Sequence, residues 1–162
     1  MSETDRKMEL LEKIARRFRE VGITWALGAS MLLYFKGIAA EFHDIDLLIA
    51  ESDAEAARTI LSGMGEFRPS SPNPKYRTRT FLEFVINGID VDVMAGFSIV
   101  SSGRLYDCSL QKEQIVEWLP LGSERIPLQS VRLWQEYYRR MGRTQKVEMI
   151  ENAMLNPQIS LP

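Results

Sequence analysis

The stretch ITWALGASMLLYFKGIAAEFHDIDLLIA, residues 23–50, holds the most informative structural pattern of the chain. It opens with a short β-rich run, turns at Gly28 and continues as an apolar helical segment over residues 30–35, which Gly37 ends. The run DIDLLIA (44–50) then alternates acidic and apolar residues before it becomes wholly apolar, as a half-buried strand does. We therefore expect a strand, a turn, a helix and a second strand in close succession.

Helices are predicted on both sides of this stretch. Residues 4–21 carry apolar side chains at three- and four-residue spacing, which indicates an amphipathic helix. Downstream, Ser52 is expected to cap a helix, with Glu55 completing a capping box and Gly63 near its end.

The second half of the chain begins with a strong hairpin signal. Asn87-Gly88 lies within RTRTFLEFVINGIDVDVMAGF (77–97), and this dipeptide between alternating apolar residues predicts a β-hairpin. Short strands are predicted between residues 98 and 127, in the segments YDCSL, QIVEWL and ERIPL. Helices are predicted over 130–141 and 144–155. The order predicts a mixed α/β (α+β) fold with a small mixed sheet flanked by helices.

Length and composition limit the class of protein. The chain has 162 residues, which fits one domain over 1–162 with a helical part at about 129–156. With 45% hydrophobic and 26% charged residues, it can form a core. A net charge of −2 excludes a polybasic nucleic-acid binder by bulk charge, so no stable nucleic-acid complex is expected.

Membrane and disulfide classes are also disfavoured. The longest apolar stretch, 25–35, is too short to span a bilayer, and the N-terminus lacks a signal-peptide pattern. One cysteine, Cys108, and one histidine, His43, allow neither an internal disulfide nor a Cys/His zinc site. We expect a soluble, cytoplasmic protein without a membrane partner.

Two pairs of carboxylates carry the chemical signal. Asp44 and Asp46 are two residues apart on one predicted strand, and Asp90 and Asp92 are two apart on another. Side chains at such spacing share a strand face, where like charges repel unless solvent or a cation separates them. Oxygen ligands of this kind suit Mg²⁺ bound together with substrate phosphates. The alternative for each pair is a solvated strand face or a strand-end cap.

The turn Gly28-Ala29-Ser30 is the third chemical feature. A turn of small residues that opens a helix presents free backbone N–H groups and the positive end of the helix dipole, which suits a phosphate. Ser30 adds a hydroxyl donor. Taken alone, the same turn is also an ordinary helix cap.

In this order, LGAS (27–30), HDIDLLI (43–49) and IDVDVM (89–94) resemble the motifs of the nucleotidyltransferase superfamily typified by DNA polymerase beta. The resemblance covers a catalytic core of about 23–94. It is strongest to small bacterial members, such as the minimal nucleotidyltransferases and the aminoglycoside and lincosamide nucleotidyltransferases.

The resemblance implies a two-metal site. Asp44 and Asp46 would coordinate two Mg²⁺ ions, and a third carboxylate would join one of them near the acceptor. Strand parity does not separate Asp90 from Asp92. The family pattern favours Asp92, and Asp90 stays the second choice. Gly28, Ala29 and Ser30 would then hold the phosphates of a nucleoside triphosphate, the donor substrate.

The implied activity is metal-dependent transfer of a nucleoside monophosphate from the triphosphate to a hydroxyl of an unidentified small molecule or protein. The alternative is a non-catalytic nucleotide-binding or regulatory module on the same fold, such as one half of a toxin–antitoxin pair. An incomplete set of carboxylates would favour that alternative, and this set is complete. A phosphate-binding α/β protein in which the carboxylates are incidental is the third possibility.

Two features qualify or extend the resemblance. Ala29 replaces the second glycine of the fuller family turn, so it would be strained if its φ is positive and harmless if it is simply the first helical residue. Arg143 and Lys146 resemble a Gly-Arg…Lys segment of some minimal nucleotidyltransferases and are expected to face the nucleotide. The alternative for this basic segment is that it complements a helix dipole.

Several other residues have competing interpretations. The basic set near the hairpin either meets phosphates or forms a solvated edge, which we favour; it comprises Arg68, Lys75, Arg77 and Arg79. The three tryptophans are expected to pack in the core or between helices: Trp25, Trp118 and Trp134. His43 either touches substrate or is structural.

Overall fold

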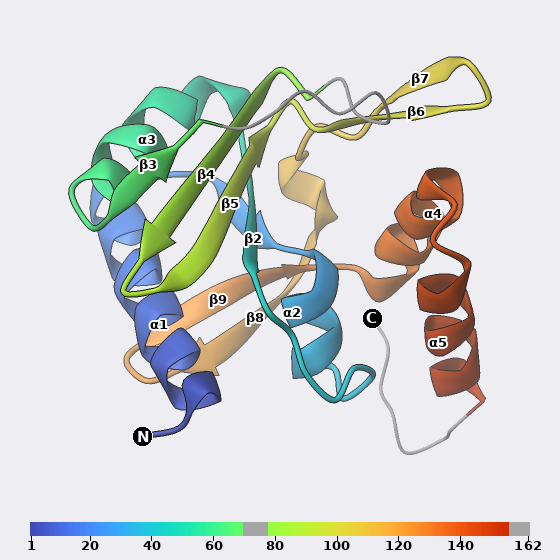
Figure 1. The fold of residues 1–162 in the computed structure, drawn as a ribbon, viewed down its shortest axis with the longest axis horizontal. Coiled ribbons are helices and arrows are strands. Elements are labelled where there is room, and N and C mark those ends of the chain that lie inside the picture. The colour runs from blue at the N-terminus through green and yellow to red at the C-terminus, as the bar shows by residue number, and fades with distance from the viewer. Residues whose placement is uncertain (70–77, 156–162) are drawn as a thin grey trace.

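The computed structural model describes residues 1–69 and 78–155. Its main sheet contains β1 (Trp25–Leu27), β2 (Ile45–Ile49), β3 (Glu66–Arg68), β4 (Thr80–Ile86), β5 (Ile89–Ala95), β8 (Ile115–Leu121) and β9 (Glu124–Gln129). These seven strands are ordered β3-β4-β5-β2-β1-β9-β8, with β2–β5 and β1–β9 parallel and the other neighbours antiparallel (Figure 1). A separate hairpin is formed by β6 (Ser98–Ser101) and β7 (Arg104–Asp107).

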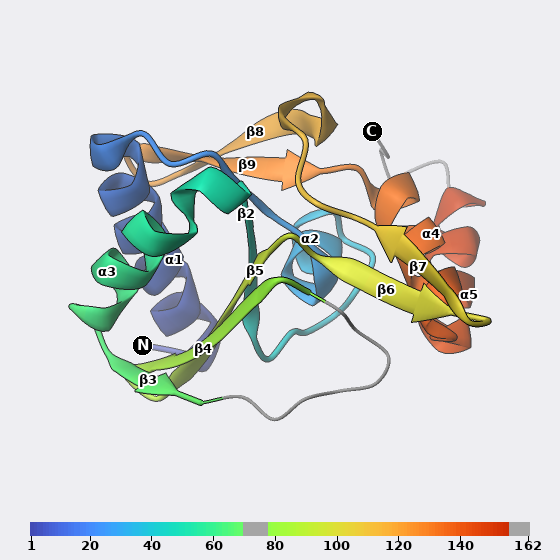
Figure 2. The same ribbon diagram turned by 90° about the horizontal axis from the view of Figure 1, so that it is seen from above.

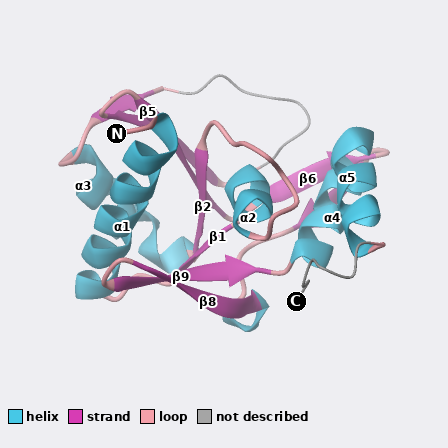
Figure 3. Ribbon diagram, turned by 90° about the horizontal axis from the view of Figure 1, so that it is seen from below, coloured by secondary structure: helices cyan, strands magenta, loops and turns pink. Residues whose placement is uncertain are grey.

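Helices cover both faces of this sheet. They are α1 (Glu3–Val21), α2 (Ala29–Phe35), α3 (Ala54–Ser62), α4 (Val131–Met141) and α5 (Thr144–Met154), with short 3-10 helices η1 (Glu51–Asp53) and η2 (Lys112–Gln114). Figures 2 and 3 show α1 and α3 on one side of the sheet, and α2 with α4 and α5 beyond it on the other. The expected mixed α/β fold with C-terminal helices is confirmed. No helix among the described residues is long and apolar enough to cross a membrane.

The hairpin of β4 and β5 is confirmed as well. Asn87 and Gly88 both have positive φ, 52° and 77°, as a tight two-residue hairpin turn requires. The turn fixes the register, so that Ile86 lies opposite Ile89 and Glu83 lies opposite Asp92. Because side chains alternate along a strand, Ile89, Val91 and Val93 of β5 face the core while its two aspartates share the other face.

Helix α1 packs against the face of the sheet opposite that of α2 (Figure 2). Its N-terminus is capped by Ser2, and its apolar stripe, which includes Leu11, Ile14 and Phe18, is fully buried. Each such side chain contributes about 1.5–3 kcal/mol by burial. Arg19 also donates two hydrogen bonds of 2.9 Å to the Glu124 carboxylate on β9.

Two local predictions are wrong. Ser52 does not cap α3, because it lies inside η1 and the helix begins after Asp53 without a side-chain cap. Trp118 is not a core residue: it lies on β8, the edge strand of the sheet, at an outward position and is 56% exposed. Trp25 and Trp134 are buried as expected. The strand predicted in YDCSL ends at Asp107, before the buried Cys108.

Candidate active site

The carboxylates meet on one face of the sheet because β2 and β5 are parallel neighbours. Their register places Asp46 directly opposite Asp92. Asp44 lies two residues before Asp46, immediately ahead of β2, and is partly buried like the other two. Because side chains alternate along a strand, these carboxylates lie on the face opposite that of the buried Ile45, Val91 and Val93.

Burial and repulsion between like charges raise the pKa values of these three carboxyl groups. The pKa of Asp46 is raised to about 8, first by burial and then by the negative charges of Asp92 and Asp44, against the opposing charge of Arg143. Burial likewise raises the pKa of Asp92 to about 7, with the charges of Asp44 and Glu83 contributing. Asp46 and Asp92 are hydrogen-bonded to each other, so the pair retains a proton near neutral pH.

Asp90 has a different environment from Asp92. It is exposed and lies nearer the start of β5, opposite Val85, whereas Asp92 is partly buried beside Asp46. The charge of Asp90 raises the pKa of Asp44, second to the effect of burial. The structure therefore joins Asp92, rather than Asp90, to the Asp46 carboxylate.

The turn at Gly28 lies next to these carboxylates. The Gly28 N–H donates to the Asp46 backbone oxygen at 3.4 Å, which ties the turn to β2. Ala29 begins α2 with a φ of 55°, so it is strained even though it is the first helical residue, and the expectation that this place makes it harmless is wrong. Strain of this kind persists only where the surrounding structure imposes it.

Two cations reach the same place from the C-terminal helices. The Lys146 Nζ lies 3.5 Å from the Ser30 Oγ. Burial, followed by the charge of Arg143, lowers the pKa of Lys146. The Arg143 guanidinium lies over the ring of Tyr138, 5.5 Å from its centre, and its charge acts on Asp46. The segment 143–146 thus faces the turn and the carboxylates.

Other residues singled out in the sequence lie elsewhere. Arg79 donates hydrogen bonds to Glu51 at 2.7 and 2.8 Å, which fixes it at the far end of β5. Arg68 is exposed on the edge strand β3, while Lys75 and Arg77 lie outside the described residues. His43 is exposed beside Asp44, whose pKa is raised by burial and then by Asp90, with His43 opposing that rise.

Three neighbours of the site were not anticipated. Glu83 lies opposite Asp92, a position that the two-residue turn at Asn87-Gly88 implies. Trp134 lies against Gly28, and Tyr138 lies beneath Arg143. No sequence signal marks the contact of Trp134 with Gly28, because it joins α4 to a residue more than a hundred positions away.

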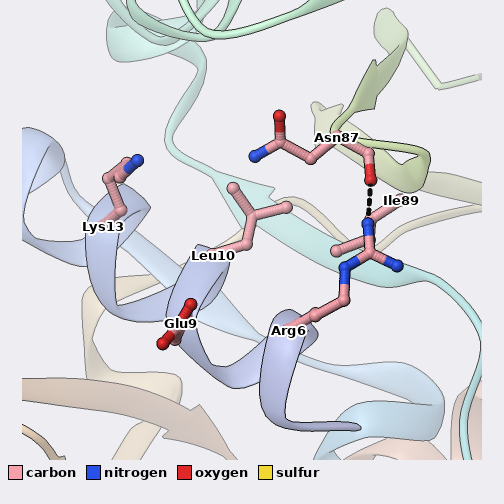
Figure 4. Close-up of a pocket in the computed structure, with 6 residues that line it drawn as sticks. All are labelled: Arg6, Glu9, Leu10, Lys13, Asn87 and Ile89. Atoms are coloured by element: carbon pink, nitrogen blue, oxygen red, sulfur yellow. Dashed lines mark hydrogen bonds between the residues drawn. The ribbon is translucent and has the colours of Figure 1, made fainter. Parts of the chain in front are cut away.

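A small pocket between α1 and the β4–β5 turn is separate from this site. Figure 4 shows its lining, in which Arg6 donates to the Asn87 backbone oxygen; the lining residues are Arg6, Glu9, Leu10, Lys13, Asn87 and Ile89. Because Ile89 and Asp90 point to opposite faces of β5, the pocket and the carboxylates lie on opposite faces of the sheet.

The donor set fits a hard divalent cation in its chemistry. It offers carboxylate oxygens whose mutual repulsion a cation would relieve. Within residues 1–69 and 78–155, however, no three His, Cys, Asp or Glu side chains already have the geometry of a metal site. A cation would have to displace the proton shared by Asp46 and Asp92, so its binding should strengthen as pH rises.

The structure is similar to that of a proposed nucleotidyltransferase, TM1012 of Thermotoga maritima, with a TM-score of 0.72 and 24% identity over 95% of each chain. The chain has the nucleotidyltransferase fold. Two structures of the antibiotic-resistance factor ANT(2'')-Ia also match it. The solution structure has a TM-score of 0.58 and 13% identity, covering 91% of this chain and 88% of the other. The complex with adenylyl-2''-tobramycin has a TM-score of 0.61 and 11% identity, covering 92% and 90%.

Comparisons of sequence alone do not assign the chain to a family. No curated protein matches the chain significantly. A family model described as "Far upstream element-binding protein, C-terminal" matches residues 133–156, which correspond to most of α4 and to α5. That match covers too small a part of the fold to assign a family.

The carboxylate pair predicts a pH dependence of stability in the absence of divalent cations. The folded pKa values of Asp46 and Asp92, about 8 and about 7, lie above the ordinary 3.8. The folded state therefore holds protons that the unfolded chain releases, and the free energy of unfolding should fall by about 1–3 kcal/mol as pH rises from 5 to 8.5. Urea unfolding in EDTA measures this fall. The pH range from 5 to 8.5 lies above that in which Glu124, whose pKa is lowered, changes its protonation.

Asp46→Asn should remove much of that fall and raise the unfolding midpoint at pH 8, whereas Asp90→Asn, at an exposed position, serves as the matched control. Equal pH profiles for the wild type and Asp46→Asn would contradict the shared-proton description.

Strain at Ala29 predicts a stabilising substitution. Glycine adopts a φ of 55° freely, so Ala29→Gly should raise the free energy of unfolding by about 1 kcal/mol. Ala56→Gly within α3 is the control and should lower it by about 1 kcal/mol, as glycine does in a helix with ordinary φ. Denaturant titrations of both variants measure the difference, and destabilisation by both would show that Ala29 is not strained.

Proposed function

We propose that the protein is a metal-dependent nucleotidyltransferase that moves a nucleoside monophosphate from a nucleoside triphosphate to a hydroxyl of a small molecule or a protein. The observation that carries the proposal is the register of β2 and β5, which sets Asp46 opposite Asp92 with Asp44 beside them. The fold shared with ANT(2'')-Ia, a protein solved with adenylyl-2''-tobramycin, supports a small-molecule acceptor.

Phosphate binding is assigned to the turn and the C-terminal cations. The Ser30 hydroxyl and the backbone N–H groups that open α2 would hold the terminal phosphates. Lys146, next to Ser30, and Arg143 would neutralise their charge. With the terminal phosphates bound there, the α-phosphate would lie on the side of Asp46 and Asp92.

The carboxylates are assigned to the reacting end. Asp44, Asp46 and Asp92 would hold Mg²⁺, which neutralises charge on the phosphates and acidifies the acceptor hydroxyl. The acceptor oxygen bonds to the α-phosphorus, the bond from that phosphorus to the β-phosphate oxygen breaks, and pyrophosphate leaves. Asp92, the carboxylate assigned to the acceptor side of the site, would take the proton of the acceptor hydroxyl.

Transfer of label tests this function directly. With Mg²⁺ and a set of hydroxylated antibiotics, or a cell lysate as the source of acceptor, label in the α-phosphate should appear on the acceptor and label in the γ-phosphate should appear in pyrophosphate. Melting curves with ATP, GTP, CTP and UTP, with and without Mg²⁺, select the donor. Binding without any transfer would favour the non-catalytic module.

The two later aspartates should differ in their effect on turnover. Asp92→Ala should lower kcat by about a thousandfold or more while nucleotide affinity changes little, because this residue is assigned to the acceptor proton. Asp90→Ala, at an exposed position nearer the start of β5, should lower kcat less than about tenfold. Steady-state kinetics with a separate binding titration decide between them, and a greater loss in Asp90→Ala would reverse the assignment.

Ser30 should discriminate between nucleotides by their phosphate number. Ser30→Ala removes a hydroxyl donor beside Lys146 and should weaken triphosphate binding several-fold, about 1 kcal/mol, with little effect on the monophosphate. Calorimetric titration of both nucleotides measures the two affinities. Equal losses for both would show that Ser30 acts only as part of the helix start.

A further inference from the structure

The indole of Trp134 lies directly on the phosphate-binding turn proposed above. A Cβ built at Gly28 would lie 2.5 Å from Trp134 Nε1 and Cζ2, so the ring occupies the space that a side chain would need. Gly28 has an extended backbone with a φ of −132°, which any residue adopts. The contact with Trp134, rather than backbone freedom, is therefore what requires glycine at this position.

Hydrogen bonds fix the indole in place. Its Nε1–H donates to Gln129 Oε1 at 2.8 Å, and Gln129 Nε2 donates to Gln114 Oε1 at 3.3 Å. Gln129 is fully buried at the end of β9, one residue beyond Leu128, which pairs with Leu27 just before the turn. Trp134 is thus oriented from the same strand that supports β1.

The turn under this ring is the strained one. Ala29 follows Gly28 with a φ of 55°, a conformation that costs an L-residue energy and that a free turn would leave. Leu27 is held by strand pairing on one side, and Ser30 is in α2 on the other. The ring of Trp134 packs on Gly28, the residue immediately before the strained Ala29.

Trp134 also lies where the C-terminal helices meet the turn. Its ring centre is 5.5 Å from that of Tyr138, over which Arg143 lies. Gln135, the next residue, donates to the Val147 backbone oxygen at 3.3 Å and to Glu151 at 2.9 Å, which joins α4 to α5. The helix pair that carries Arg143 and Lys146 is therefore fixed to the turn through Trp134.

We propose that Trp134 is a positioning residue that holds the strained Gly28–Ser30 turn and sets it at a fixed place relative to Arg143 and Lys146, so that all three face the phosphates of a nucleoside triphosphate together. The ligand part of this inference rests on the proposed function. The structural part concerns only Trp134 and the turn, and is tested separately.

A double-mutant cycle on stability tests the structural part. If Trp134 imposes the strain, Ala29→Gly raises the unfolding midpoint in the wild type but leaves it nearly unchanged in Trp134→Phe, where the turn is free to relax. Trp25→Phe, a buried tryptophan packed on Phe18 of α1, is the matched background and should keep the full gain. The same gain in all three backgrounds would overturn the proposal.

The ligand part is tested by the ratio of two affinities. The probes are the triphosphate that gives the largest Mg²⁺-dependent melting shift and its own monophosphate. Trp134→Phe should lower the triphosphate-to-monophosphate affinity ratio about tenfold, whereas Trp25→Phe should leave it unchanged. A general loss of packing would weaken both nucleotides alike, and that result would overturn the positioning role.

A second route keeps the test decisive if Trp134→Phe does not fold. Gln129→Leu removes the acceptor of the indole N–H and should lower the same ratio, while Gln129→Glu retains an acceptor and should restore it. An unchanged ratio in Gln129→Leu would contradict the proposal. If the wild type binds no triphosphate, the proposed function fails, and the stability cycle still decides whether Trp134 holds the turn.

Discussion

Parallel pairing between β2 and β5 places Asp46 opposite Asp92, and the rest of the site is arranged around that pair. A shift of one residue in this register would send one aspartate to the buried face. The apolar residues that alternate with the aspartates, Ile45, Val91 and Val93 among them, are fully buried and prevent such a shift. Burial of apolar side chains on one face of β2 and β5 therefore fixes the register that places Asp46 beside Asp92 on the other face.

Those like charges are unfavourable for the folded chain alone. The raised pKa values of Asp46 and Asp92 record the cost, which burial and mutual repulsion impose together. The C-terminal helices bring Arg143 and Lys146 to the same region, so opposite charges face each other across the proposed nucleotide site. Such an arrangement suits a ligand that carries phosphates and a divalent cation, because it can satisfy both sets of charges at once.

The sequence allowed prediction of the parts that depend on local patterns. Alternation predicted the strands and placed Asp46 and Asp92 on strand faces, and the turn at Asn87-Gly88 predicted the hairpin whose register brings Glu83 opposite Asp92. Contacts between distant segments were beyond prediction. Alternation does not show which strand lies at an edge, so Trp118 was wrongly placed in the core. The contact of Trp134 with the turn joins residues more than a hundred positions apart and has no periodic signal.

In the proposed function, these carboxylates and the Gly28–Ser30 turn bind the two ends of one metal–nucleotide complex. A crystal structure with Mn²⁺ and a non-hydrolysable nucleoside triphosphate tests it most directly, because manganese is located by its anomalous scattering. We expect manganese among Asp44, Asp46 and Asp92, with the terminal phosphates at Ser30 and Lys146. Manganese and nucleotide bound elsewhere, or a nucleotide whose phosphates point away from the turn, would contradict it.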